Sequence, residues 1–479
     1  MTIFGSMKSF ACFILVLLAM FSCLATQKVA CIGASITYGH GIDNREQYSF
    51  PAQLQTLLGK DYAIANYGVS GTTLLHKGDK PYWNTPQYQA ALNNLPDIVV
   101  IDLGGNDSKL INRVYLGEYE KDYAELIQSF RQLSSHPRII LLLPIPSFLR
   151  DTTQIYDRVI VKDIIPRIQQ VAYNEQVEVV DMHSLFVDQE KLMPDKIHPN
   201  GEGAGIYAQR LHALLTAKRD TVFNIFTQLP HFVQDSMKKS SFYGYVRADF
   251  NYMTRKCKVV KPKWVAPNRP WVWRARFWGH EPQADIALLE RGFHIVYCDV
   301  AELFGNPEAI SAWNAYYALM TKNGLAKKTI LEGMSRGGVY AFNWAAENPD
   351  RVAAVYVDNP VLDLKSWPAG LGRLPAYPKE YELFKTDYQL TSLEQVQGFK
   401  GSPIEKVPQI VKGHYPILIL CADADEAVAP EENTIPFVEK VKALKGNITV
   451  IYKAGFKHHP HSLPNPTPIV EFIVKAAGK

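Results

Sequence analysis

Residues 329–338 read Thr-Ile-Leu-Glu-Gly-Met-Ser-Arg-Gly-Gly, a short strand-forming run that leads into a serine between glycines. The pattern is G-x-S-x-G from Gly333 to Gly337, and a helix-forming segment follows it near Val339. Glycines on both sides let the chain turn sharply from strand to helix, and this turn raises the serine hydroxyl above the end of a parallel sheet. The stretch therefore predicts an α/β domain with Ser335 as a nucleophile.

An acid and a histidine follow Ser335 in the order that such a site requires. Asp425 comes after one strand-like run, and His458 and His459 come after the next. Either histidine suits the position of the general base, and Asp358 is a weaker candidate for the acid. This half of the chain resembles the α/β-hydrolase superfamily, which implies a nucleophile, an acid and a base at these positions.

The same resemblance implies an oxyanion hole and the mouth of a pocket. The oxyanion donors would be the backbone N–H of Arg336 and one N–H from the loop at Phe277, after the strand-like run 271–275. Arginine forks pair with carboxylates and aromatic rings stack on sugar faces, so this loop also predicts substrate contacts. The candidate substrate-binding residues are Arg274, Arg276, Trp278 and His280.

A second serine stands earlier in the chain, directly after the strand-like run that begins at residue 28. Ser35 ends the stretch Gly-Ala-Ser, and three further blocks follow at the ends of later predicted strands and near residue 198. These blocks are Asn66-Tyr-Gly-Val-Ser-Gly71, Gly104-Gly-Asn-Asp107 and Asp195-Lys-Ile-His198. The ordered set resembles the SGNH (GDSL-type) hydrolase family over nearly all of residues 28–217.

That resemblance implies a second catalytic set. Ser35 would be the nucleophile, His198 its general base and Asp195 the carboxylate that orients the imidazole. The oxyanion would be held by the backbone N–H groups of Ser35 and Gly71 and by the side chain of Asn106. A serine hydroxyl needs such a base, because it is a weak nucleophile until its proton is removed.

One position departs from the family pattern. Ala34 stands where the family usually carries an aspartate. That aspartate has a supporting function outside the catalytic triad, so we expect the first site to remain active.

Strand-like and helix-like runs alternate in two separate series, which predicts parallel sheets covered by helices on both faces. The fold class is α/β, with two three-layer αβα domains. The first resembles an SGNH hydrolase with a flavodoxin-like parallel sheet, and the second an α/β-hydrolase. The predicted divisions are a signal peptide (1–25), an SGNH hydrolase domain (26–217), a linker and docking segment (218–255) and an α/β-hydrolase domain (256–479).

The N-terminal segment has the layout of a secretory signal peptide. An apolar run from Phe10 to Phe21 follows Lys8, and small residues precede a cleavage position after Ala25. This predicts a secreted or periplasmic protein. The alternative is that Cys23 becomes the lipid-modified first residue of an outer-membrane lipoprotein.

Composition narrows the function classes. The 479 residues carry a formal net charge of +4, which does not predict a nucleic-acid-binding protein, and no stretch is long enough for a membrane span. The cysteines beyond the export segment lack metal-ligand spacing and lie in apolar runs, so we expect buried free thiols. They are Cys31, Cys257, Cys298 and Cys421. We expect no metal and no cofactor.

The segments around residues 271–285 and 458–463 are similar to secreted bacterial carbohydrate esterases. This resemblance implies a polysaccharide or oligosaccharide ester as substrate. We expect the first domain to remove acetyl groups and the second to cleave another ester, such as a methyl-esterified uronic acid. The alternatives are a lipase or thioesterase acting on small acyl esters, and a carbohydrate-binding protein in which one or both sites are inactive.

Overall fold

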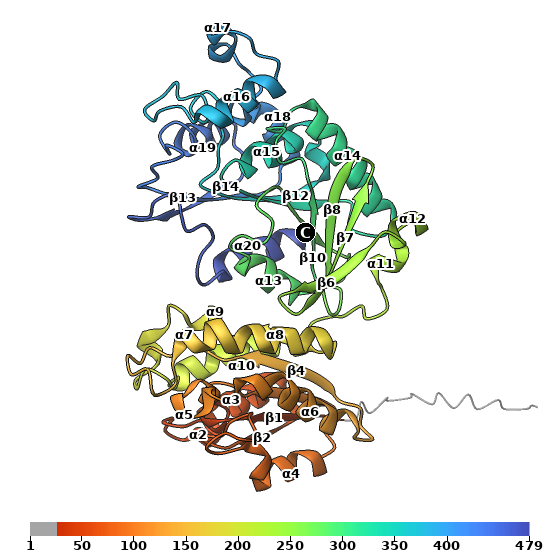
Figure 1. The fold of residues 1–479 in the computed structure, drawn as a ribbon, viewed down its shortest axis with the longest axis vertical. Helices are drawn as coiled ribbons and strands as arrows, with labels where there is room; N and C mark the ends of the chain where they lie inside the picture. The colour runs from red at the N-terminus through yellow and green to blue at the C-terminus, as the bar shows by residue number, and fades with distance from the viewer. Residues whose placement is uncertain (1–25, 479) are drawn as a thin grey trace, which may run out of the picture.

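A computed structural model describes residues 26–478 of the protein (Figure 1). The predicted signal peptide, with Cys23, lies outside the described residues. The chain forms two α/β domains, each built on its own sheet, which confirms the predicted fold class. Within residues 26–478, no helix combines the length and the apolar character that crossing a bilayer requires.

The first domain is built on a parallel sheet of five strands in the order β2-β1-β3-β4-β5. This is the flavodoxin-like order, in which ligands bind at the carboxyl ends of the strands. The strands are β1 (Gln27–Gly33), β2 (Tyr62–Gly68), β3 (Ile98–Asp102), β4 (Arg138–Leu143) and β5 (Glu178–Asp181).

Helices cover both faces of this sheet because its central strands are apolar on both sides. Residues of β3 and most of β4 are buried, as a strand between two helical layers requires. The helices are α1 (Ser35–Tyr38), α2 (Arg45–Tyr48), α3 (Phe50–Leu58), α4 (Pro86–Asn93), α5 (Leu110–Arg113), α6 (Tyr119–Arg131), α7 (Asp157–Val159), α8 (Ile165–Asn174), α9 (His183–Phe186) and α10 (Gly201–Leu215). Helices α3 and α10 share one core cluster, and α6 and α8 share another.

The second domain has a sheet of nine strands in the order β14-β13-β12-β11-β9-β10-β8-β7-β6. Strands β9 to β14 run parallel, and β6, β7 and β8 extend the sheet in antiparallel fashion beyond β10. The strands are β6 (Lys238–Phe242), β7 (Tyr245–Tyr252), β8 (Arg255–Lys261), β9 (Trp271–Arg274), β10 (His294–Cys298), β11 (Thr329–Met334), β12 (Val352–Asp358), β13 (Ile417–Ala422) and β14 (Ile448–Lys453).

The helices of the second domain divide between the two faces of its sheet. Helices α14 and α15 share a core cluster with one face, and α13 and α20 pack on the other face, which looks toward the first domain (Figure 1). The helices are α11 (Ile225–Gln228), α12 (His231–Gln234), α13 (Gln283–Leu289), α14 (Pro307–Lys322), α15 (Gly337–Glu347), α16 (Pro378–Asp387), α17 (Leu393–Gln397), α18 (Val407–Ile410), α19 (Thr434–Ala443) and α20 (Thr467–Ala477).

The segment 218–255 differs from the predicted linker. It does contain a hairpin, but β6 and β7 of that hairpin are strands of the second sheet, and β7 pairs with β8 along seven registered positions from Val246 to Tyr252. The predicted boundary between residues 255 and 256 therefore falls inside a continuous sheet. The physical reason is that β8 pairs with β10 on one side only. Without β7, the backbone hydrogen-bonding groups on its other side would be unpaired.

The two domains pack against each other through buried polar contacts. Glu290, directly after α13, accepts the backbone N–H of Asp181 at 2.7 Å and pairs with Arg210 of α10 at 2.5 Å. The turn between β6 and β7 approaches α8 closely at Gly244, whose φ is 91° and whose Cα hydrogen faces the Gln169 carbonyl. Residues of both domains also belong to one apolar cluster, so the domains share a packed interface.

We predict that Glu290→Gln destabilises this interface. The substitution leaves Arg210 buried without its counter-charge, and losing one partner of a buried pair costs about 3 kcal/mol or more. Denaturant unfolding followed by intrinsic fluorescence measures the loss. Glu308→Gln is the matched control, because Glu308 pairs with Arg255 at the surface, where the side chain of Glu308 is 64% exposed, and the expected loss is under about 1 kcal/mol. Equal losses in the two variants would contradict the interpretation.

Candidate active sites

The first site joins a serine, a histidine and an aspartate from distant segments. Ser35 follows β1 and opens α1, and its Oγ lies 2.8 Å from Nε2 of His198. Nδ1 of His198 lies 2.6 Å from Oδ2 of Asp195. Because a carboxylate only accepts, Nδ1 carries the proton, which leaves Nε2 free to accept the hydroxyl hydrogen of Ser35.

Hydrogen bonds from its own loop favour the ionised form of Asp195. Partial burial raises the pKa of this carboxyl, but hydrogen bonds from the His198 side chain and from the backbone N–H groups of His198 and Ile197 lower it below its usual value. An ionised carboxylate at this position stabilises a positive charge on the imidazole.

The predicted oxyanion donors lie on two other loops at the same sheet edge. Gly71 has a φ of 84°, a left-handed conformation that glycine adopts without strain. Asn106 is buried and lines a cavity beside Ser35 together with Gly105. Its amide has two N–H donors, and the carbonyl of Thr72 takes one of them at 3.0 Å.

Two buried aspartates support these loops and were not among the predicted site residues. Asp107 accepts the backbone N–H groups of Leu74 and Leu75 at 3.1 and 2.9 Å, which ties the loop after β2 to the loop after β3. Asp102 accepts the hydroxyl of Thr37 at 2.9 Å beneath α1. In the block from Gly104 to Asp107, the adjacent Asn-Asp pair was the sequence signal for Asp107. No spacing in the sequence marks Asp102.

The cavity beside Ser35 is small and mostly apolar. Its walls include Pro144, Ile145, Ile155 and Ile197, together with Ala34 at the departure from the family pattern. Such walls favour a short apolar acyl group over a charged one.

We predict that Asp102→Asn stabilises the protein at neutral pH. Burial raises the pKa of Asp102 to about 6 from the unfolded value of 3.8. The folded state then binds the proton more tightly, so this carboxyl lowers stability as pH rises from about 4 through 6, by roughly 3 kcal/mol in total. Asparagine still accepts from Thr37 and does not titrate.

Thermal unfolding midpoints at pH 4 and pH 7 measure this effect. The advantage of the variant is expected at pH 7 and is expected to shrink toward pH 4. Asp61→Asn, at an exposed position of the same domain, controls for the loss of one charge. A pH-independent difference would show that Asp102 does not titrate in this range.

The second candidate nucleophile, Ser335, lies on a sharp turn between β11 and α15. Ser335 has a φ of 50°, which is uncommon for a residue with a side chain. A Cβ on Gly333 would lie 2.6 Å from the carbonyl oxygen of Gly337, and one on Gly338 would lie 2.6 Å from the ring of Pro360. Glycine is therefore required on both sides of this turn.

The structure distinguishes between the two candidate histidines. Nε2 of His458 lies 3.0 Å from Oγ of Ser335, and its Nδ1 lies 2.7 Å from Oδ2 of Asp425. Among the described residues, no hydrogen bond joins His459 to either partner. Asp358 instead contacts Lys453 at 2.8 Å and His461 at 3.3 Å, so it does not face the base.

Arg274 does not occupy the predicted position at the pocket mouth. Its side chain is 1% exposed and pairs with Asp285 and Glu332 beneath the loop. It also donates to the carbonyl oxygens of Phe277, at 3.1 Å, and His280. The prediction that Arg274 binds substrate is therefore wrong. A buried guanidinium needs acceptors for all its N–H groups, and Arg274 finds two of them in backbone carbonyl groups of this loop. Arg274 therefore fixes the position of the loop.

Trp278 also departs from the prediction, since it packs against Phe242 and Tyr297 with ring centroids 5.2 and 5.7 Å apart. Arg276 lies against the start of α15, where it donates to the Ala301 carbonyl and pairs with Glu302. Both side chains are engaged inside the domain.

His280 and Phe277 remain close to the second site. The ring centroid of His280 lies 5.8 Å from that of His459 and 6.1 Å from that of His461. Phe277 has a φ of 53°, and its ring lies 5.9 Å from the guanidinium of Arg336. The loop that carries both residues therefore borders the turn of the nucleophile.

Arg336 is the unusual charge at this site. Its guanidinium lies 5.6–5.9 Å from the rings of Phe277, Phe304 and Trp367. Its Nη1 is buried without a hydrogen-bond partner among residues 26–478. Burial and the charge of Arg276 lower the pKa of Arg336. A guanidinium surrounded by aromatic rings, with an unpaired N–H donor on the residue next to Ser335, favours an anionic ligand.

Comparison with known proteins supports the description of the first domain. Residues 31–206 match the GDSL-like Lipase/Acylhydrolase family. The first domain is a GDSL-like domain. The matched range contains the predicted nucleophile Ser35 and its predicted partners Asp195 and His198. The match does not extend into the second domain.

An acetylxylan esterase of Xylanibacter ruminicola is 41% identical to the chain over 206 residues, which cover 39% of this chain and 43% of that protein. The chain thus spans less than half the length of this curated relative. Among solved structures, a carbohydrate acetylesterase family member from Sinorhizobium meliloti is 20% identical, with a TM-score of 0.34 over 40% of this chain and 97% of its own. An acylaminoacyl peptidase of Pyrococcus horikoshii is 14% identical, with a TM-score of 0.37 over 53% of this chain and 43% of its own. Scores this low establish no common fold.

Proposed function

We propose that the chain is a carboxylic ester hydrolase with two serine sites that act on esterified carbohydrate. The observation that carries the proposal is an imidazole held between a carboxylate and a serine hydroxyl, once in each domain. This arrangement activates serine for attack on a carbonyl carbon.

At the first site, Ser35 attacks the ester carbon while His198 takes the hydroxyl proton, and Asp195 stabilises the imidazolium. The N–H groups of Ser35 and Gly71 and the amide of Asn106 donate to the negative oxygen of the tetrahedral intermediate. His198 returns the proton to the leaving alcohol. Water then attacks the acyl-enzyme with His198 again as base, which releases the acid and restores Ser35.

The second site follows the same sequence with Ser335, His458 and Asp425. Here the developing oxyanion accepts from the backbone N–H of Arg336 and from the N–H of Phe277. Two loops thus converge on one oxygen, as the fold of such hydrolases requires.

The two sites differ in the substrates we propose. For the first, the small apolar cavity and the relative that is named an acetylxylan esterase favour an acetyl ester of a polysaccharide or oligosaccharide. For the second, the unpaired guanidinium of Arg336 favours an ester within an acidic saccharide, such as a methyl-esterified uronic acid beside a free uronate. We also propose export of the protein, from the layout of residues 1–25.

We predict that each serine accounts for one activity. Ser35→Ala removes acetate release from acetylated xylan, and Ser335→Ala removes methanol release from methyl-esterified pectin, each by at least about a thousandfold. A fluorophosphonate probe labels two serines in the unchanged chain and one in each variant. Ser134→Ala, at an exposed position of the first domain, is the matched control for the loss of one serine hydroxyl.

The rival functions give different results in the same assays. A carbohydrate-binding protein with inactive sites takes no label. A lipase or thioesterase hydrolyses long-chain nitrophenyl esters faster than acetate. A labelled chain that releases neither acetate nor methanol contradicts the substrates proposed here but not the esterase chemistry.

We predict that Arg336→Gln weakens binding of acidic substrates at the second site. Losing one charge-assisted contact raises KM for a partly methyl-esterified oligogalacturonide about tenfold or more. The backbone N–H of residue 336 is retained, so turnover of a neutral nitrophenyl ester changes little. Arg351→Gln, an exposed arginine on the same domain, is the matched control. An equal loss on acidic and neutral esters would show that the guanidinium acts in catalysis and not in recognition.

A further inference from the structure

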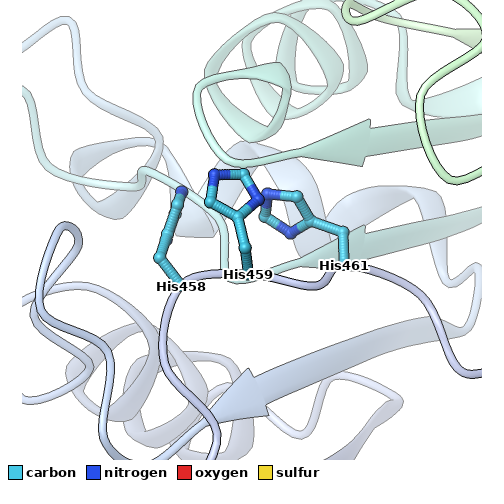
Figure 2. A group of neighbouring side chains, drawn as sticks. All are labelled: His458, His459 and His461. Carbon is cyan, nitrogen blue, oxygen red and sulfur yellow. The ribbon is translucent and has the colours of Figure 1, made fainter.

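The loop after β14 carries three histidines within four positions, and the proposed esterase chemistry uses only one of them. Figure 2 shows the rings of His458, His459 and His461 rising from the same side of this loop. One ring nitrogen from each residue lies within 4.8 Å of the other two. The remaining two imidazoles therefore need an explanation of their own.

The three rings lie close enough together for one ion to be shared among them. Their centroids are 5.0, 4.9 and 4.8 Å apart, and their planes stand at 83°, 82° and 78° to one another. The rings therefore meet edge to face and do not stack, and one nitrogen of each lies within 4.8 Å of the others. A zinc ion binds each nitrogen at about 2 Å, so small rotations of these side chains close the site. His280 stands beside His459 as a fourth neighbour.

Carboxylates already orient two of the three rings. Nδ1 of His458 contacts Asp425 at 2.7 Å, and Nδ1 of His461 contacts Asp358 at 3.3 Å. In both rings the Nε2 atom remains as the acceptor. Histidines that bind metals usually donate their other N–H to a carboxylate in this way, which fixes the tautomer and raises the basicity of the ligand.

The charges around the cluster suit a divalent cation. Asp425 and Asp358 are buried acids behind the rings, and Glu281 lies beside His280 at 4.0 Å. Lys453 pairs with Asp358 at 2.8 Å and donates to the carbonyl of Pro460 at 3.0 Å, so its ammonium has two acceptors of its own. Imidazole-rich sites of this kind favour Zn²⁺ among the common divalent ions.

We propose that His458, His459 and His461 bind one Zn²⁺ ion, and that the bound ion switches off the second site. The Nε2 lone pair of His458 accepts the hydroxyl proton of Ser335 in the active state. A metal bound to that lone pair leaves Ser335 without a base. The first site has no part in the cluster, so its reactivity stays unchanged. No bond is made or broken in this step beyond metal coordination.

Labelling by a fluorophosphonate probe tests the proposal within a single chain. In the full, untagged protein, Zn²⁺ is expected to protect Ser335 from the probe, while Ser35 labels at its metal-free rate. Chelation with EDTA restores labelling of Ser335. Protection of both serines, or of neither, would overturn the proposal.

Variants and a direct binding measurement make the test independent of esterase activity. Isothermal titration calorimetry with Zn²⁺ alone is expected to show one site per chain, weakened at least about tenfold by His459→Ala and not by His231→Ala at the exposed start of α12. Inhibition of each variant is compared with its own metal-free rate. Equal affinities in the His459 and His231 variants would place any bound zinc elsewhere and overturn the assignment.

Discussion

Each candidate site depends on an imidazole ring held between a carboxylate and a serine hydroxyl. The ring must meet both partners within hydrogen-bond distance, although His198 is 163 residues from Ser35 and His458 is 123 residues from Ser335. A parallel sheet meets this requirement because all its strands end at the same edge, where successive loops converge. The fold of both domains can be understood as the support for these two hydrogen-bond chains.

Buried polar groups hold the loops at that edge. In the first domain Asp107 accepts two backbone N–H groups and fixes one loop against the next. In the second domain Arg274 holds the loop after β9 through the carbonyl oxygens of Phe277 and His280. Such groups are costly to bury, and each is stable only because its hydrogen bonds are satisfied. They hold in place the loops that carry the candidate catalytic residues.

The order of motifs along the chain was sufficient to predict two α/β domains and the side chains that meet at both candidate sites, because strand ends and turn glycines leave local signals. It was insufficient for Arg274. A strand alternates its side chains, so Trp273 and Arg274 face opposite sides of β9, and the face that receives Arg274 is covered by α13 with Asp285. The extension of the second sheet by β6 and β7 was missed for a related reason, since pairing between strands depends on partners that no local pattern reveals.

By itself, the sequence determined the two candidate nucleophiles, the order of their candidate partners and the residues that permit each sharp turn, because these follow from local backbone geometry and residue chemistry. Tertiary structure alone decided between His458 and His459, which are neighbours in the chain and chemically identical. It also decided that Nη1 of Arg336 has no hydrogen-bond partner within residues 26–478, while Arg274 and Arg276 find partners. Which side chain meets which partner depends on packing between segments distant in sequence, and that packing is a property of the folded chain as a whole.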